Sequence, residues 1–373
     1  MVTVFLQSCP AELSAVALRV FNSRTVKILN WCQTFEVLAS VVAPVFDTPW
    51  RHGSGWPAFR LARGTVRTLP KTFILVNPAA GRGRALRAQP HVADYLRLQG
   101  HAAEFAQSHS AEDFERRAAE AAAAGYERIV ALGGDGTFQS LVRATLGAPV
   151  ALGFFPAGGG NDIAAALGIP KDPVAAAYVF LRSQPRSMDV VRARFAEKTR
   201  IYIGGGGLGL DAEAARLANG KFQRLPGAAR YVASALWALV NFQAFHLEGE
   251  LDGKRVLRAS DPLMIAAVSN TPSYGAGIKI APAAEIDDGL LDITLVAQMS
   301  WMRLVEAIPP ILQTGNLRWP EIRRFRASRV ILRVDRPEMF HGDGELLGEL
   351  SPGMSLEIEN LPGAIQVVAP ARR

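Results

Sequence analysis

The sequence predicts an α/β doubly wound domain followed by a β-rich sandwich domain. From Lys71 to about residue 187, short apolar runs alternate with segments that have helical spacing. This alternation is typical of a parallel sheet covered by crossover helices. After about residue 188, strand-like segments dominate, and only residues 228–242 and 302–313 have helical spacing. Such a series of short strands favours a β-sandwich for this part of the chain.

The elements of the first domain follow one another in a regular order. In chain order we expect a strand and glycine-rich loop at 72–83, a helix at 85–100, a strand at 102–108, a helix at 110–125, a strand and loop at 127–137, a helix at 138–147, and another strand–loop–helix unit at 149–169. Ser110 is a suitable N-cap for the second helix, and acidic residues follow it in the first turn. The repeated unit indicates parallel strands.

In the second domain we expect strands separated by turns. The strand-like segments are 187–195, 199–207, 245–256, 261–270, 290–297, 328–334, 354–360 and 365–369. We therefore assign residues 71–187 to the first domain and residues 188–351 to the second. The C-terminal segment, about residues 352–373, is a candidate for a final strand that belongs to the first domain again.

Residues 1–70 differ from the rest and form an N-terminal extension of unknown role, with a linker predicted at 48–59. Its longest apolar stretch, residues 28–46, is interrupted by three polar residues. We interpret that stretch as an interfacial or buried helix rather than a membrane span. The two cysteines, Cys9 and Cys32, both lie in the extension, which excludes a cysteine-based zinc site or disulfide framework elsewhere. A reducing cytoplasmic setting fits this usage.

Three loops of the first domain are rich in glycine: 77–83, 133–137 and 156–162. One such loop is explained by a tight strand-to-helix turn, because glycine adopts positive φ without strain. Glycines also let the backbone approach an anion, and N–H groups at a helix start point toward it. The carboxyl ends of parallel strands meet at one edge of the sheet. Three glycine-rich loops at that edge indicate a phosphate-binding crevice.

Five segments occur in the order and spacing of one known family. They are "NPAAGRGRA", "GGDGTFQSLV", "PAGGGNDIAAALGIP", "SYGAGIKIAPAAEIDDGLLDI" and "HGDGELLGELSPGMSLEI", within residues 72–367. With them the chain resembles the diacylglycerol kinase catalytic family of bacterial lipid kinases, which is related to sphingosine kinases. The resemblance implies a two-domain lipid kinase fold like that of NAD kinases, with ATP and Mg²⁺ as cofactors. The segment "GGDGT" alone is also similar to NAD kinases and 6-phosphofructokinases.

The resemblance implies a set of nucleotide-binding residues. They are Asn77, Pro78, Ala79, Ala80 and Gly81 of the first loop, Ser108 in the place of a usual threonine, Gly133, Gly134, Asp135, Gly136, Thr137, Phe138, Gln139 and Ser140 around the phosphates, and Gly159. Asp135 is expected near the phosphate and the metal. Phosphoryl transfer needs positioning and charge neutralisation more than covalent chemistry, and backbone N–H groups supply both.

The resemblance also implies metal and catalytic residues. Asp288, with the backbone carbonyls of Glu285 and Leu290, matches a structural Mg²⁺ loop, although an Asp-Gly turn between strands explains the same letters. The pair Asp343 and Glu345 carries the acid that would take the proton of the acceptor hydroxyl. A hairpin turn is the alternative for this pair, and the sequence leaves open which of the two is the base.

Two further aspartates follow strands or loops at the same edge. Asp162 and Asp189 could join Asp135 in an acidic network around water and metal. The alternatives are a helix N-cap for Asp162 and a surface position for Asp189.

The chain departs from the family pattern at several positions. Gln139 and Ser140 stand where asparagine and glutamate are usual, Gly159 replaces a threonine, Gly204 stands near a usual asparagine, and Arg82 and Arg84 replace lysines. These changes remove polar contacts to a nucleotide. They could weaken ATP binding, alter donor choice or mark a degenerate kinase.

We expect an ATP- and Mg²⁺-dependent kinase that phosphorylates the hydroxyl of a membrane lipid, with a diacylglycerol-like acceptor first. The alternatives are a soluble-substrate kinase like NAD kinase, or a catalytically weak lipid- or nucleotide-binding regulatory protein. The net charge of +7 suits anionic partners. We expect cytoplasmic protein at the inner membrane face, no nucleic-acid partner and a possible homodimer.

Overall fold

A computed structural model describes residues 70–371 apart from 223–232, 235–236, 240–241, 259–261 and 276. The predictions for the N-terminal extension, including the apolar stretch, the linker and both cysteines, lie outside the described residues. So does most of the helix predicted at 228–242.

The first lobe is built on four parallel strands. They are β1 (Thr72–Val76), β2 (Ala103–Gln107), β3 (Arg128–Gly133) and β4 (Ala151–Pro156), in the spatial order β2-β1-β3-β4. Strands β1, β3 and β4 are almost entirely buried. Central parallel strands are covered on both faces, so their sequences are continuous apolar runs rather than alternating ones.

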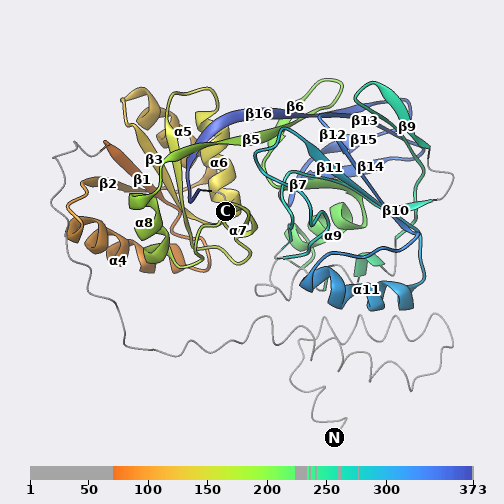
Figure 1. Ribbon diagram of the computed structural model, residues 1–373, viewed down its shortest axis with the longest axis horizontal. Coiled ribbons are helices and arrows are strands. Elements are labelled where there is room, and N and C mark those ends of the chain that lie inside the picture. The colour runs from red at the N-terminus through yellow and green to blue at the C-terminus, as the bar shows by residue number, and fades with distance from the viewer. Residues whose placement is uncertain are drawn as a thin grey trace, which may run out of the picture. The chain divides into compact units, whose positions relative to one another are not determined.

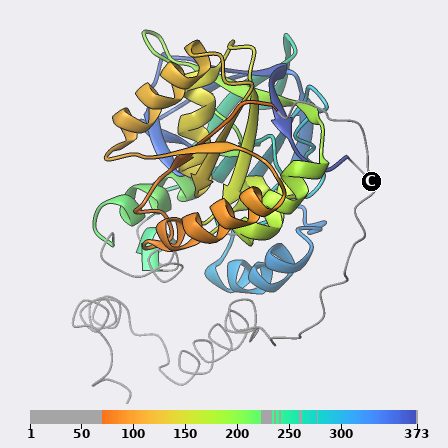
Figure 2. The ribbon, with the colours of Figure 1, turned by 90° about the vertical axis from the view of Figure 1, so that its left-hand side faces the viewer.

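Helices cover both faces of this sheet. They are α4 (Arg84–Leu98), α5 (Ala111–Ala123), α6 (Asp135–Thr145), the short α7 (Asp162–Ala166) and α8 (Pro173–Arg182). Helices α4 and α8 pack together on one face, and α5 and α6 pack together on the other (Figures 1 and 2). Ser110 caps α5 as predicted, and its hydroxyl accepts the Asp113 N–H at 3.1 Å. Helix α8 was not predicted, although Asp172 and Pro173 are good start signals.

Two long strands carry the sheet into the second lobe (Figure 1). β5 (Pro185–Arg194) and β16 (Leu356–Val368) run antiparallel along each other. Residues Gln366 and Val367 of β16 pair with β4, whereas residues 356–359 pair with β13. The boundary expected at 187/188 therefore falls inside β5. The two strands predicted at 354–360 and 365–369 are one strand with a register shift between Leu361 and Ile365.

The second lobe is a β-sandwich, which confirms the predicted fold class. Its other strands are β6 (Thr199–Tyr202), β7 (Gly205–Gly209), β8 (Leu247–Leu251), β9 (Lys254–Arg258), β10 (Leu263–Ser269), β11 (Leu291–Ala297), β12 (Ile322–Ala327), β13 (Arg329–Val334), β14 (Glu338–Gly342) and β15 (Glu345–Leu350). One layer continues the first sheet. The other is a six-stranded antiparallel sheet in the order β12-β11-β10-β7-β14-β15.

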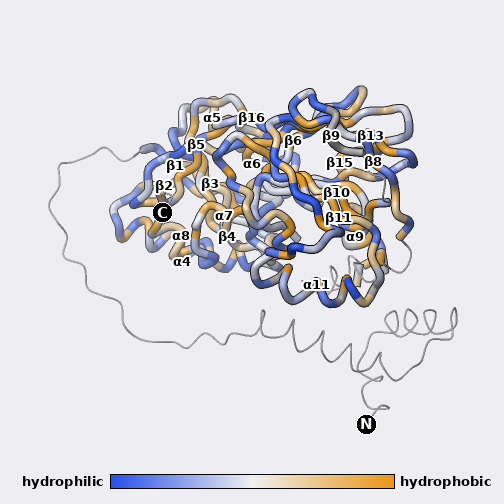
Figure 3. Tube along the Cα trace, turned by 45° about the vertical axis from the view of Figure 1, so that its right-hand side comes forward, coloured by the Kyte–Doolittle hydropathy of each residue, from blue (hydrophilic) through white to orange (hydrophobic). Residues whose placement is uncertain are grey.

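Apolar side chains from both layers fill the space between the two sheets, and Figure 3 shows the apolar strands inside this lobe. Tyr202 and Phe340, both fully buried, lie in this core with ring centroids 5.9 Å apart. The sandwich core thus fixes β6 and β14, the two strands that lead to the region around Asp343.

Two helices accompany the sandwich. α11 (Trp301–Gln313) matches the helix predicted at 302–313, and α9 (Leu210–Asn219) was not predicted because it begins directly after a run of glycines. Among the residues that the structure describes, no helix is long and apolar enough to cross a membrane.

Candidate active site

A cavity of about 490 Å³ lies where the loops after β1, β2 and β3 meet. Its lining contains most of the residues predicted to bind nucleotide: Asn77, Pro78, Ala79, Ala80, Gly81, Ser108, Gly134, Gly136, Thr137 and Ser140. His109, Ser110, Ala111 and Phe114 complete the wall from the first lobe, and Glu345 comes from the second. Such an opening at the carboxyl edge of a parallel sheet is the usual place for a ligand.

Asn77 connects the loop after β1 to the first turn of α6, which follows β3. Its amide Nδ2 donates to Thr137 Oγ1 at 3.0 Å, and its Oδ1 accepts the Ala79 N–H at 3.2 Å. Gly81 adopts a φ of 57°, and a Cβ there would collide with the Ala157 carbonyl. The loop geometry therefore depends on a side-chain amide and on a glycine that lets two loops touch.

The glycines around Asp135 serve two different purposes. A Cβ on Gly133 would lie 2.5 Å from Thr137 Oγ1, and one on Gly158 would lie 2.6 Å from the Gly134 Cα. Packing against Thr137 of α6 explains Gly133, and contact between neighbouring loops explains Gly158, in both cases without a ligand. At Gly136 and Gly159, no described atom lies within 4 Å of the site of a Cβ. These two leave open space for an anion to approach.

Asp135 links α6 to the start of α7. Its carboxylate accepts the N–H groups of Asp162 and Ile163, both at 3.1 Å. Burial, and then the neighbouring charge of Asp162, raise the pKa of Asp135 to about 7. Asp135 therefore sits behind the cavity wall in a site where a nearby positive charge would stabilise its ionised form.

Asp343 is held by the turn between β6 and β7. Its Oδ2 accepts the Ile203 N–H at 2.7 Å, and its Oδ1 accepts the N–H groups of Gly204 and Gly205 at 2.8 and 3.1 Å. Burial raises the pKa of Asp343 above its usual value, and the three N–H donors oppose that rise. A Cβ on Gly204 would lie 2.9 Å from Asp343 Oδ1, which explains why no larger residue stands there.

The structure brings Asp135, Asp162 and Asp343 together. The charges of Asp162 and Asp343 both raise the pKa of Asp135, and Ser273 Oγ donates to Asp162 Oδ1 at 3.0 Å across the two lobes. Asp189 is not part of this group. It is buried, and its carboxylate accepts the N–H groups of Gly289 and Gly363 at 2.7 and 2.8 Å. The surface position considered for Asp189 is therefore wrong.

Glu345 has a different environment from Asp343. Its exposed carboxylate lines the cavity and pairs with Arg143 at 2.8 Å. Arg143 also pairs with Glu115 at 2.9 Å and donates to Ser140 Oγ at 3.1 Å. Sequence analysis missed Arg143; its signal is its place on α6, three residues after Ser140. The structure thus separates the two acids that the sequence left as a pair.

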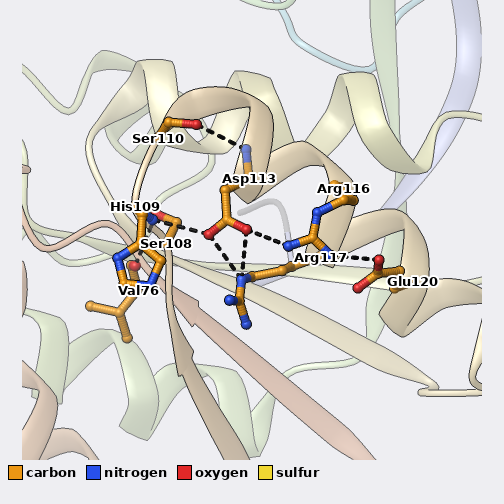
Figure 4. A network of polar contacts seen from close by, with 8 residues as sticks. All are labelled: Val76, Ser108, His109, Ser110, Asp113, Arg116, Arg117 and Glu120. Atoms are coloured by element: carbon orange, nitrogen blue, oxygen red, sulfur yellow. Dashed lines mark hydrogen bonds and ion pairs between the residues drawn. The ribbon is translucent and has the colours of Figure 1, made fainter.

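Ser108 and its neighbours form one part of the cavity wall (Figure 4). Ser108 Oγ donates to the Val76 carbonyl at 3.3 Å. Asp113 accepts the His109 N–H at 3.0 Å and pairs with Arg116 and Arg117. The His109 N–H and these pairs lower the pKa of Asp113 to about 2. Asp113 thus keeps its negative charge over the working pH range and fastens the wall to α5.

Two predicted nucleotide residues face away from the cavity. Phe138 is buried and stacks on Phe154, with ring centroids 4.8 Å apart. Gln139 is fully buried, and neither its amide oxygen nor its nitrogen has a hydrogen-bond partner within the described residues. Both side chains are internal, and that of Phe138 packs on the sheet through Phe154 of β4.

The loop predicted to hold Mg²⁺ is fastened by nitrogen donors instead. The Asp288 carboxylate pairs with Arg326 and accepts the Leu290 N–H at 3.0 Å. The Leu290 carbonyl accepts Asn360 Nδ2 at 2.9 Å. Arg326 thus brings a positive charge to this loop, while the Asp288 carboxylate and the Leu290 carbonyl keep free lone pairs, so the Mg²⁺ site stays a prediction. In the described part of the chain, no group of three or more His, Cys, Asp or Glu side chains is arranged to hold a metal ion.

The chain is similar to known proteins over nearly all of its described length. Residues 71–193 match the family described as "Diacylglycerol kinase catalytic domain", and residues 206–369 match the "YegS C-terminal NAD kinase beta sandwich-like domain". A diacylglycerol kinase of Mycobacterium tuberculosis (strain ATCC 25618 / H37Rv) is 30% identical over 306 residues, which cover 80% of this chain and 95% of that protein. A probable lipid kinase YegS-like of Chromohalobacter salexigens is 29% identical over 285 residues, covering 72% and 88%.

A solved structure has the same fold. The crystal structure of a putative diacylglycerol kinase from Bacillus anthracis str. Sterne aligns with a TM-score of 0.65 at 21% sequence identity, and the alignment covers 82% of this chain and 99% of that one. At this identity the likeness concerns the fold alone.

The Arg326 contacts predict how the protein responds to metal removal. Because the Arg326 guanidinium already pairs with both Asp288 and Asp292, EDTA should leave the thermal unfolding midpoint unchanged. Arg326→Gln should lower the midpoint by about 2–4 °C, the shift for roughly 1 kcal/mol in a domain of this size. Millimolar Mg²⁺ should then restore part of that loss. Differential scanning fluorimetry measures all three midpoints.

Arg333→Gln is the matched control, since Arg333 pairs with Glu250 at 2.8 Å in another exposed cross-strand pair. Its midpoint should not respond to Mg²⁺. A fall in the wild-type midpoint on adding EDTA would show that the loop binds a metal after all.

Proposed function

The chain belongs to the diacylglycerol kinase family of lipid kinases, and from this premise we propose that it transfers the γ-phosphoryl group of ATP to the hydroxyl of a membrane lipid. A diacylglycerol-like lipid is the first acceptor to test. The relative from Mycobacterium tuberculosis is named a diacylglycerol kinase, which supports this choice of acceptor.

One observation carries the proposal: a buried carboxylate with a raised pKa lies beside the cavity. Asp343 is two residues from Glu345, which lines the cavity, and its charge raises the pKa of Asp135. A carboxylate whose pKa is raised toward neutrality is a stronger base than one at its usual value. An acid so placed is suited to take the proton of an attacking hydroxyl.

The donor would enter the cavity as the Mg²⁺ complex of ATP. The ion that accompanies ATP neutralises phosphate charge during transfer. The backbone at Gly136 and Gly159 has the open space that a phosphate needs. The loops of Asn77 and Ser108 would enclose the rest of the nucleotide, since both line the cavity.

In the transfer step, the acceptor hydroxyl oxygen forms a bond to the γ-phosphorus while the bond to the bridging oxygen of ADP breaks. The hydroxyl proton passes to Asp343. The three N–H donors to Asp343 leave one lone pair free on Oδ2, because each carboxylate oxygen has two acceptor positions and Oδ1 already accepts two N–H groups. They fix the carboxylate in one orientation, which is what a general base requires.

Glu345 is less suited to that task. Its carboxylate is exposed and paired with Arg143, so a proton on it would have to displace an arginine. Its contacts support a role in shaping the cavity wall and joining the two lobes. We therefore assign the proton to Asp343.

A membrane lipid as acceptor requires contact with a lipid surface. The net charge of +7 favours an anionic membrane face. We propose peripheral association with the cytoplasmic face on this basis.

The direct test is incubation with γ-labelled ATP and vesicles that contain one candidate lipid each. The proposal expects label in the organic phase with diacylglycerol vesicles, and none with Asp343→Asn protein. Label transferred to NAD instead would favour a soluble-substrate kinase. ATP binding with no labelled product from diacylglycerol or from a total lipid extract would overturn the proposal and favour a regulatory protein.

The two acids should separate kinetically. Asp343→Asn should lower kcat by about 10²–10⁴ with little change in ATP affinity, because the base meets the acceptor hydroxyl. Glu345→Gln should keep kcat within about tenfold and change KM instead, since its carboxylate only pairs with Arg143. Steady-state kinetics with ATP titrations measures both. Equal loss of kcat in the two variants would contradict the assignment.

Folding of the Asp343→Asn variant has to be checked by its thermal midpoint. Asparagine tolerates the φ of 52° at this position, but its amide NH₂ would face a backbone N–H. That change costs about 1–3 kcal/mol.

Gly159→Thr should strengthen ATP binding. The position is exposed, with no described atom within 4 Å of a Cβ and without positive φ, so threonine fits without a clash. One added hydrogen bond is worth about 0.5–1.5 kcal/mol, which lowers the KM for ATP about two- to tenfold. Gly159→Ala is the matched control, because it stiffens the backbone but brings no hydroxyl. An unchanged or higher KM for the threonine variant would mean that the site has adapted to glycine.

A further inference from the structure

An arginine bridges the two lobes at the edge of the cavity. Arg143 Nη1 donates to the Glu345 carboxylate at 2.8 Å, Nε donates to Glu115 at 3.0 Å, and Nη2 donates to Ser140 Oγ at 3.1 Å. Glu115 and Ser140 belong to the first lobe, on α5 and α6, whereas Glu345 begins β15 of the second lobe. The positive charge of Arg143 is therefore shared between carboxylates of both lobes.

The position of Arg143 on α6 directs its side chain toward the cavity. Gly136, Ser140 and Arg143 follow one another at intervals of four and three residues, so they share one face of the helix. Gly136 and Ser140 line the cavity. Long side chains on a helix lean toward its N-terminus, and the contact with Ser140 shows this direction for Arg143. The guanidinium thus lies beside the lining, on the helix face where Gly136 leaves room for an anion.

The lining by itself is poorly charged for a polyphosphate. Among the described residues that form it, none is a lysine or an arginine, and Glu345 is the one carboxylate. A nucleoside triphosphate is a polyanion, and a carboxylate in its site repels it. Arg143 offsets that carboxylate, because the two side chains form an ion pair. The affinity for the phosphates should therefore depend on which anion this guanidinium faces.

The ion pair between Arg143 and Glu345 is weak enough to be exchanged. The two side chains are 27% and 48% exposed, and ion pairs with such exposure contribute little free energy because water competes for both charges. A polyphosphate carries more negative charge than a carboxylate and competes for the same guanidinium. Glu115 and Ser140 hold the arginine from within the first lobe, so it stays at the cavity when Glu345 leaves.

We propose that Arg143 determines the affinity for nucleotide by exchanging its partner: it pairs with Glu345 while the cavity is empty, and an entering polyphosphate displaces Glu345 from the guanidinium. The inference rests on the proposed function, which gives the cavity a nucleoside triphosphate as its ligand. It assigns recognition of the phosphates to Arg143 and makes Glu345 a competing anion. The two residues act in opposite directions on the same binding step.

The first experiment measures the Kd of the Mg²⁺ complex of ATP by isothermal titration calorimetry, with the full chain and no lipid. Glu345→Gln removes the competing anion and should tighten binding about three- to tenfold. Arg143→Gln removes the phosphate contact and leaves Glu345 unpaired, so it should weaken binding by about tenfold. These factors lie between those of a fully exposed charge pair and a buried one.

The double variant Arg143→Gln/Glu345→Gln tests the phosphate contact itself. If Arg143 contacts a phosphate, the double variant should bind ATP about three- to tenfold more weakly than Glu345→Gln alone. Equal affinity of these two proteins would mean that Arg143 only offsets Glu345, and would overturn the exchange. Weaker binding in Glu345→Gln than in the wild type would show that the ion pair supports the cavity wall, which also contradicts the proposal.

A series of nucleotides separates charge from shape. AMP, ADP and ATP share the base and the ribose but differ in the number of phosphates. The gain in affinity in Glu345→Gln should grow from AMP to ATP, and it should shrink as the salt concentration rises from about 0.05 to 0.5 M, because salt screens exposed charges. An equal change for all three nucleotides would indicate altered packing of the cavity wall and refute the exchange.

Arg192→Gln is the matched control. Arg192 pairs with Glu359 between β5 and β16, its side chain is 29% exposed, and neither residue lines the cavity. Its Kd for ATP should equal that of the wild type. Thermal unfolding midpoints check that each variant is folded. Glu345→Gln changes an exposed side chain, so the sign of its effect decides the proposal even if Arg143→Gln does not fold.

None of these measurements requires lipid phosphorylation. A protein that binds ATP with this order of affinities but phosphorylates no lipid would contradict the proposed function and support the exchange. A lipid kinase in which Glu345→Gln binds ATP no more tightly than the wild type would do the reverse. Wild-type protein that binds no ATP would overturn both. Failure of the proposed function is therefore distinguishable from failure of this inference.

Discussion

A carboxylate can be buried only where N–H or O–H donors surround it, and this requirement organises the cleft. Asp343 satisfies it with three backbone N–H groups from the turn between β6 and β7. That turn must therefore present its backbone to the hairpin that carries the acid. Glycine at position 204 follows directly, because a side chain would occupy the space of the carboxylate. The acid and the turn that holds it are one unit.

Two other aspartates meet the same requirement, and each lies where segments distant in sequence come together. Asp189 satisfies it with N–H groups from two turns, and in this way fastens β5 to the loop before β11 and to the bulge of β16. Asp135 satisfies it with the first N–H groups of α7. Buried carboxylates thus connect segments that are distant in sequence. Removing one of these donors takes away part of that compensation, which costs about 1–3 kcal/mol.

Glycines near the site have two physical roles that look alike in a sequence. Gly134 and Gly158 are close because two loops touch, and Gly133 packs against Thr137 in the helix that follows it, whereas Gly136 and Gly159 face open space. Only the second kind is available to a ligand. A strand that ends in glycines is therefore explained partly by packing and partly by the room it leaves for phosphate. The sequence alone cannot separate these reasons, since Gly134 and Gly158 contact each other from two different loops.

The sequence by itself determined the fold class, the order of strands and helices in the first lobe, and most of the cavity lining. Local periodicity and turn residues encode these features, because each depends on neighbours in the chain. It did not show α8, α9 or the single long β16, and it left Asp343 and Glu345 undivided. Only the tertiary structure decided those points. In the folded chain, Gln139 is buried in the core, Glu345 pairs with Arg143, and Asp288 pairs with Arg326. Asp211 lies within hydrogen-bond distance of His341. These outcomes depend on contacts between residues far apart in sequence, whose geometry exists only once both lobes are packed.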